Sequence, residues 1–265
     1  MLTYPQLSTG TLAQYPLSKT ILKRTIVNDC LDSRTVKLSD SAASLARWQL
    51  TYSGLTEAEW SMLQSLFTQT EGRLYPFVFL DPTDNLLRFS ETLTSTVWQK
   101  DGLLELTSGV ADPLGTTRAT ALHNATSIGQ AISQTIQAAG WFRYSFSVFV
   151  RSASPTSVTL MRRTTDSQES VTQAVGPSWQ QIQTSGDIPG EAEEIEFSLS
   201  IPAGSTVEVF GFQAEAQGQP SAYKKTESRG GVYGAARFDD DALSPIAVGP
   251  NDYSLRVQLV SKTGN

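Results

Sequence analysis

The sequence predicts a mainly β protein: a β-sandwich domain with one α-helix, into which a second β-sandwich of jelly-roll type is inserted. Only 17% of the residues are charged, and small polar residues are frequent, which suits strands and turns better than surface helices. Apolar and polar residues alternate along much of the chain, whereas one stretch has helical spacing. Two strands predicted at the C-terminus cannot form a domain alone, so we expect them to complete the N-terminal sheet.

The first predicted strands lie between residues 21 and 52. Near their end, Trp48, Leu50 and Tyr52 alternate with polar residues and should share one face of a sheet. The preceding residues 2–18 include two prolines and are expected to be an extended arm that adds to the sheet edge of a neighbouring subunit.

A helix is predicted over residues 56–70. Thr56 can cap it, and Glu59, three residues later, completes a capping box. The apolar stripe of this helix should consist of Trp60, Leu63 and Phe67.

Residues 86–226 form a series of short predicted strands with turns between them, which is typical of a sandwich or jelly roll. The segment lies between two turn sequences, Asp81-Pro82 and Arg229-Gly230-Gly231. Because the ends of most domains lie close together, an insertion at this point is feasible. We therefore expect residues 1–85 and 227–265 to form one discontinuous domain around the insertion.

Composition and charge exclude several classes of partner. The net charge is −6 and the pI is about 4.9, so we expect no nucleic acid and no anionic membrane as a partner. No apolar stretch is long enough to insert into a membrane, and the N-terminus lacks the pattern of a secretory signal. The single cysteine, Cys30, excludes an intramolecular disulfide and a cysteine zinc site, and we expect it to be a half-buried thiol.

The residues that enzymes need are scarce. His123 is the only histidine and is expected to be an ordinary strand or surface residue. The acidic clusters at 239–241 and 191–194 flank turns and should be solvated charge. We expect no enzyme, no catalytic residue, no cofactor and no metal site.

Aromatic and basic residues in the inserted segment are the candidates for sugar contact, because a pyranose stacks on a flat ring. Trp141 is expected to be the most exposed aromatic, although packing against a neighbouring loop or subunit is an equal alternative. Arg162 and Arg163 could bind a sugar hydroxyl, with an exposed basic pair as the default interpretation. Trp98 and Trp179 are expected to be core residues.

Two groups of motifs resemble known families. The first is an alternating strand, a Leu-Thr helix start and a Phe-x-Phe-x-Asp-Pro strand, at residues 47–52, 55–56 and 77–82, with Arg237-Phe238-Asp239 and an apolar strand at 255–260 near the end. This order resembles phage tail proteins related to the distal tail ring protein. The second group resembles a jelly-roll module of phage tail and virion proteins, itself similar to carbohydrate-binding modules. Its motifs lie at 85–91, 98–102, 112–117, 129–132, 144–150, Trp179, 211–215 and 220–226.

The first resemblance implies a structural virion component. Such a protein would be made in the cytoplasm of the bacterial host and would form a six-fold ring with itself at the tail tip. There it would join the tail tube to the tip or hub proteins and to the host-recognition apparatus. The second resemblance leaves an alternative open, a glycan-binding adsorption protein that acts on the host cell surface. A glycosidase or depolymerase ranks last, because the catalytic residues are missing.

Overall fold

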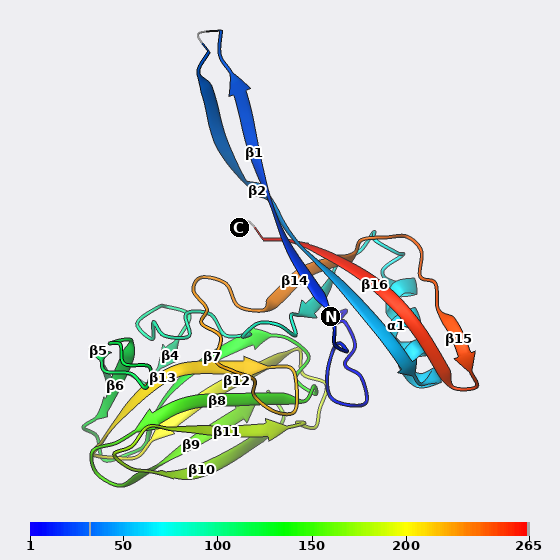
Figure 1. Cartoon of the computed structure of the whole chain (residues 1–265). Helices are drawn as coiled ribbons and strands as arrows, with labels where there is room; N and C mark the ends of the chain where they lie inside the picture. The colour runs from blue at the N-terminus through cyan, green and yellow to red at the C-terminus, as the bar shows by residue number, and fades with distance from the viewer. Residues whose placement is uncertain (32, 264–265) are drawn as a thin grey trace. The chain divides into compact units, whose positions relative to one another are not determined.

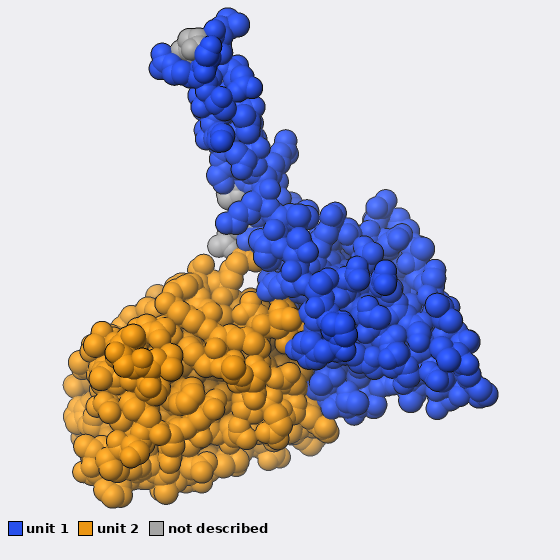
Figure 2. Space-filling view, in the orientation of Figure 1, with its two compact units in different colours: residues 1–79, 233–265 blue, residues 80–232 orange. Residues whose placement is uncertain are grey.

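The computed structural model describes residues 1–31 and 33–263. Its chain divides into two compact units (Figure 2): unit 1 comprises Met1–Phe79 and Tyr233–Asn265, and unit 2 comprises Leu80–Val232. The described elements are β-strands and one α-helix, so the protein is mainly β as the sequence predicts. Within the described residues, no helix is both long and apolar enough to cross a bilayer.

Unit 1 is built on a six-stranded sheet in the order β1-β2-β16-β14-β3, with β15 added beside β16 (Figure 1). These strands are β1 (Ser18–Asp29), β2 (Thr35–Leu55), β3 (Phe77–Leu80), β14 (Val232–Phe238), β15 (Ile246–Gly249) and β16 (Asp252–Lys262). β16 pairs antiparallel with the second half of β2, from Leu45 to Leu55. The C-terminal strands therefore complete the N-terminal sheet, as predicted.

The predicted alternation in β2 builds the centre of this sheet. Trp48, Leu50 and Tyr52 are all buried. The ring of Trp48 contacts Phe79 at 5.0 Å and Tyr233 at 4.6 Å between centroids, both in edge-on geometry. One face of the β2 segment therefore carries the core.

The predicted helix is α1, Glu57–Gln69, and it begins with the expected capping box between Thr56 and Glu59. Trp60 and Leu63 are buried, and Phe67 is half-buried against Phe238, with ring centroids 5.0 Å apart. Leu66 is a further buried residue that the predicted stripe did not include.

The expectation of a free N-terminal arm at residues 2–18 is wrong. The amide of Tyr4 donates to the carbonyl of Val78 at 2.8 Å, and the amide of Val78 donates to the carbonyl of Leu2 at 2.9 Å. Tyr4 and Leu12 are fully buried in unit 1. The apolar residues of this segment follow neither strand nor helix periodicity, so the sequence gives no sign that they join the core.

The carboxylate of Glu59 connects this segment to the helix start. Its Oε1 accepts hydrogen bonds from the amide of Ser8 at 3.0 Å and the hydroxyl of Ser8 at 2.7 Å. Its Oε2 accepts from the amide and the hydroxyl of Thr56, both at 2.9 Å. Desolvation raises the pKa of Glu59, but these four bonds together outweigh it and lower the pKa from 4.5 to about 2.

We expect Glu59→Gln to lower the free energy of unfolding of unit 1 by about 2 kcal/mol at pH 7, because an amide cannot accept all four bonds. The pKa of this carboxyl is depressed in the folded state, so its contribution is present above pH 4.5 and is lost as the pH falls towards 2. Urea unfolding at pH 7 and at pH 3 measures this, with the exposed Glu71→Gln as the control. A difference between wild type and Glu59→Gln that does not shrink at pH 3 would contradict the explanation.

Unit 2 is a jelly-roll β-sandwich of two five-stranded sheets, β10-β9-β12-β7-β4 (the β12 sheet) and β11-β8-β13-β6-β5 (the β13 sheet). The strands are β4 (Gln99–Lys100), β5 (Leu104–Val110), β6 (Ala119–Asn124), β7 (Gln130–Gln137), β8 (Tyr144–Arg151), β9 (Thr156–Arg163), β10 (Gln168–Val175), β11 (Gln180–Gly186), β12 (Glu194–Ile201) and β13 (Ser205–Glu215). Phe146 contacts Phe197 at 5.3 Å and Phe212 at 6.2 Å between ring centroids, so aromatic rings from both sheets meet in the core.

The two ends of unit 2 lie side by side. The amide of Asp81 donates to the carbonyl of Gly231, and the amide of Gly231 donates to the carbonyl of Asn85, both at 2.7 Å. The side chain of Asn85 is buried; it donates to the carbonyl of Phe212 at 2.8 Å and accepts from the amide of Ala214 at 3.0 Å. Asn85 thereby fixes the first residues of unit 2 to β13, the central strand of the β13 sheet.

Candidate functional site

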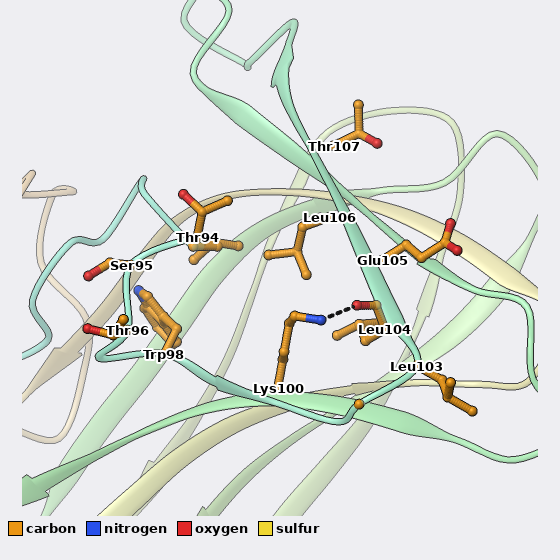
Figure 3. Close-up of a pocket in the computed structure, with 12 residues that line it drawn as sticks. Thr94, Ser95, Thr96, Trp98, Lys100, Leu103, Leu104, Glu105, Leu106 and Thr107 are labelled. Atoms are coloured by element: carbon orange, nitrogen blue, oxygen red, sulfur yellow. Dashed lines mark hydrogen bonds between the residues drawn. The ribbon is translucent and has the colours of Figure 1, made fainter.

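A cavity of about 710 Å³ opens in unit 2 beside β4 and β5 (Figure 3). The loop before β4 forms one side of it, and the turn between the strands and β5 itself form the other (Figure 3). The residues that line it are Leu93, Thr94, Ser95, Thr96, Trp98, Lys100 and residues 102–107.

Successive turns shape the loop side of the cavity. The amide of Thr92 donates to Phe89, that of Ser95 to Thr92 and that of Trp98 to Ser95, each at 3.0 Å to the carbonyl. Trp98 is buried against Phe212, with ring centroids 4.8 Å apart, and its indole N–H donates to the carbonyl of Phe89 at 3.0 Å. The prediction that Trp98 is a core residue is confirmed, and its ring also forms part of the cavity wall.

The strand side combines apolar and charged groups. The ammonium of Lys100 donates to the carbonyl of Leu104 at 2.8 Å, which holds the lysine across the turn (Figure 3). Leu104 is buried, Leu106 is half-buried and Leu103 is largely exposed. Glu105 is the single carboxylate among the lining residues.

The lining mixes polar and apolar residues. The lining includes four hydroxyl residues, Thr94, Ser95, Thr96 and Thr107, together with leucines, and the hydroxyls of Ser95 and Thr96 are directed away from Lys100 and Leu106 (Figure 3). Glycoside hydrolysis by the common mechanism needs a pair of carboxyl groups across the scissile bond, and the lining supplies only Glu105.

The three residues predicted to contact glycan lie elsewhere. Trp141 is 40% exposed in the loop between β7 and β8, with its ring edge-on to Phe142 at 6.0 Å. Arg163 is half-exposed and pairs with Glu196 at 2.9 Å. Neither residue lines the cavity.

The default interpretation of Arg162 and Arg163 as an exposed pair is wrong for Arg162. Consecutive residues of a strand point to opposite faces, and Arg162 is on the inner face, opposite Phe197 of β12. It is buried, and its guanidinium donates to the carbonyls of Gly186 and Tyr144. Burial lowers the pKa of Arg162 below its ordinary value.

The closing motif of the module covers part of the outer face of the β13 sheet. Gly211 has a φ of +68° and a Cβ here would lie 3.0 Å from the ring of Tyr223. Gln213 accepts from the amide of Lys224 at 2.7 Å, and Glu215 accepts from the amide of Ser221 at 2.7 Å and pairs with Lys224 at 2.6 Å. These residues fasten the last segment of unit 2 across the sheet, so that part of the face is occupied by the chain itself.

His123 and the acidic cluster at 239–241 lie outside this cavity. His123 is exposed on β6 and its Nδ1 is 2.8 Å from the hydroxyl of Thr206. Asp239 and Asp241 pair with Arg47 and Arg73, each at 3.0 Å. In the described part of the chain, no group of three or more His, Cys, Asp or Glu residues is placed to hold a metal ion.

Cys30 is exposed rather than half-buried. Its amide donates to the carbonyl of Arg34 at 2.7 Å, which places it at the turn between β1 and β2. The expectation was wrong because the sequence did not show that these two strands extend beyond the core of unit 1.

The cavity residues were missed from sequence, although one signal was present. Four of the five residues 92–96 carry hydroxyls, and Trp98 follows after Val97. Such a run beside a tryptophan in a turn region is a reasonable sign of a polar binding loop.

Comparison with known proteins gives matches only among solved structures. No family model matches the chain. No curated protein matches it. The enzymatically active domain of tailspike protein 4 of bacteriophage CBA120 is similar, with 13% identity and a TM-score of 0.42; the match covers 52% of this chain and 22% of the tailspike chain.

Two carbohydrate-binding modules are also similar. The CBM22-1 xylan-binding domain of Paenibacillus barcinonensis Xyn10C has 15% identity and a TM-score of 0.42, over 52% of this chain and 99% of that domain. TmCBM61, solved in complex with beta-1,4-galactotriose, has 17% identity and a TM-score of 0.40, over 49% of this chain and 97% of that chain. The description of unit 2 as a jelly roll follows from its own strand order.

Proposed function

We propose that unit 2 binds glycan in the cavity beside β4 and β5 and that the protein acts in adsorption to a glycan-bearing host surface. The observation that carries this proposal is the lining of the cavity. It combines hydroxyl residues, leucines and Trp98 with only one carboxylate. A sugar presents the same combination of hydroxyls and apolar C–H groups.

The proposed role is binding without chemistry. The cavity lacks the carboxyl pair of a glycosidase, and His123 lies outside it. A shallow site of this kind binds weakly, so adsorption needs several copies on one particle, which multiply the affinity.

A second candidate role is that of a structural subunit of a phage-type tail, as the sequence resemblance implies. In this role the protein forms a ring with itself, six-fold by that resemblance, between the tail tube and the tip or hub proteins of the virion. The specific observation in its favour is in unit 1, whose sheet extends into an exposed apolar hairpin. The two roles are compatible, because unit 1 would assemble and unit 2 would bind glycan.

The glycan proposal is tested with the whole protein on a broad glycan array, followed by titration with the best ligand. We expect Leu103→Glu to weaken binding at least tenfold, because it places a charge on the 68% exposed leucine of the cavity. Leu114→Glu is the matched control, since Leu114 is 65% exposed in unit 2 but does not line the cavity.

Two outcomes would contradict the proposal. If no glycan binds the wild-type protein, only the structural role remains. If Trp141→Ala abolishes binding while Leu103→Glu leaves it unchanged, the glycan binds at the β7–β8 loop and the cavity is not the site.

A further inference from the structure

We infer that the β1–β2 hairpin of one copy of this protein docks on the β15 edge of a second copy. The inference deepens the structural role proposed above and is independent of glycan binding. It rests on the exposed apolar face of the hairpin, on β15 as a strand with one pairing partner in the described sheet, and on the charges of the two segments.

The hairpin continues past the core of unit 1 as a two-stranded ribbon. β16 pairs with β2 only from Leu45 onward, whereas β1 pairs with β2 back to Thr35. Among the described strands, none pairs with the distal part of the hairpin, residues 23–40, as a third strand. Figure 1 shows this part projecting from the sheet of unit 1. We call this part the arm. An isolated two-stranded ribbon is marginally stable in water, so the arm should gain stability from a partner.

One face of the arm is apolar. Ile26 is opposite Leu38 and Asn28 is opposite Val36, and cross-strand pairs share a face. The exposed fractions are 38% for Ile26, 43% for Val36 and 52% for Leu38. The other face is more polar, with the pairs Thr25–Ser39, Val27–Lys37 and Asp29–Thr35. An exposed strip of β-branched and leucine side chains on one face of a ribbon is a typical interaction surface.

β15 offers a matching surface in the same unit. It pairs only with β16 in the described sheet. Ile246 and Val248 are both largely exposed, and Val248 lies at an irregularity in the pairing of β15 with β16. A smaller cavity of about 190 Å³ lies close by in sequence, lined in part by Phe238, Leu243 and Val257.

The charges of the two segments are complementary. Residues 23–40, the arm, contain four basic residues and three acidic ones, a net charge of 4 − 3 = +1. Residues 239–252 contain four aspartates and no basic residue, a net charge of −4, of which Asp239 and Asp241 pair with Arg47 and Arg73 of the same chain. Opposite net charges steer the two surfaces together and fix their orientation.

The arm cannot reach the β15 of its own chain. β15 is beside the first residues of β16, which pair with the end of β2 near Leu55, whereas Leu38 of the arm is near the start of β2. Seventeen residues of extended strand separate Leu38 from Leu55, roughly 55 Å at about 3.3 Å per residue. The occupant is therefore a second copy. Because arm and edge are different surfaces, the contact is head-to-tail and closes into a ring when the rotation between copies allows.

The test uses the whole protein and the arm variant Ile26→Lys/Leu38→Lys. In analytical ultracentrifugation we expect the wild type to form oligomers. At the same concentrations the variant should remain monomeric, because its self-association should be at least tenfold weaker. The matched control, Thr25→Lys/Ser39→Lys, adds the same charges to the opposite face and should still associate. Because the charges contribute, association should also weaken between 0.1 and 1 M salt.

A second measurement identifies the contact directly. Cys30 is the only cysteine and is exposed at the tip of the hairpin, so a photoreactive maleimide attached there should crosslink to residues 239–252 of another copy. A wild type that stays monomeric up to high concentration, or an unchanged oligomer of the arm variant, would overturn the inference. Crosslinks that map elsewhere would overturn the β15 contact while leaving the ring standing. Unchanged glycan binding by the monomeric arm variant would separate this result from the function of unit 2.

Discussion

Replacing Gly230 with alanine is expected to destabilise unit 2 by about 3 kcal/mol or more. A Cβ at this position would lie 2.3 Å from the carbonyl oxygen and 2.8 Å from the carbonyl carbon of Leu86. Both are backbone atoms, so no side-chain rotation relieves the overlap. The chain would have to move apart at the place where Gly231 and Asn85 share a hydrogen bond of 2.7 Å.

Thermal and urea unfolding of the whole protein measure this effect, with amide exchange of Leu86 and Gly231 as a local readout. Gly234→Ala is the matched control, because a Cβ at Gly234 would meet nothing within 4 Å. A Gly230→Ala protein that unfolds like wild type, with amide exchange unchanged at both positions, would show that the two ends of unit 2 do not need this close approach.

This glycine illustrates where sequence reasoning stops. From the sequence, Gly230 and Gly231 indicate a turn and nothing more. The contact that requires Gly230 joins residues more than a hundred positions apart, and no local pattern reports it.

Features decided by neighbouring residues were predicted well. The capping box of α1 depends on Thr56 and Glu59, three residues apart, and the structure contains it. The alternation of Trp48, Leu50 and Tyr52 gives their shared buried face directly. In both cases, the pattern and the interaction have the same short range.

Features decided by distant contacts were not predicted. The sequence does not say which face of β9 is inside, so the burial of Arg162 was missed. The sequence predicts strands near residues 20–38, but it does not show that these strands continue beyond the part of β2 that pairs with β16. For this reason the exposure of Cys30 was predicted wrongly. The cavity was missed for the same reason, because its wall needs the loop at 93–98 to meet β5.

The N-terminal segment is the largest correction to the sequence interpretation, and its core residue is Tyr4. The hydroxyl of Tyr52 donates to the carbonyl of Leu12 at 2.7 Å, so at the 2.8 Å contact between the two tyrosines it is Tyr4 that donates. The ring of Tyr4 packs edge-on against Phe79 at 5.5 Å between centroids. Burial, the largest cause, raises the pKa of Tyr4 well above its ordinary value, so the hydroxyl is a neutral donor at every physiological pH.

Tyr4→Ala is therefore expected to lower the free energy of unfolding of unit 1 by about 4 kcal/mol, the usual cost of removing a fully buried aromatic ring. Tyr4→Phe keeps the ring and loses only the hydroxyl, so it should cost about 1 kcal/mol. Amide hydrogen exchange in increasing urea measures this separately for each unit: the amides of β2 and α1 report on unit 1, and those of β8 and β12 in unit 2 should stay unchanged. If residues 2–18 were instead an extended segment free of the core, both substitutions would be neutral for folding and would harm only assembly. Wild-type stability of Tyr4→Ala would thus restore the extended-arm hypothesis, whereas the expected loss leaves the β1–β2 hairpin as the segment of unit 1 that is available for contact with another copy.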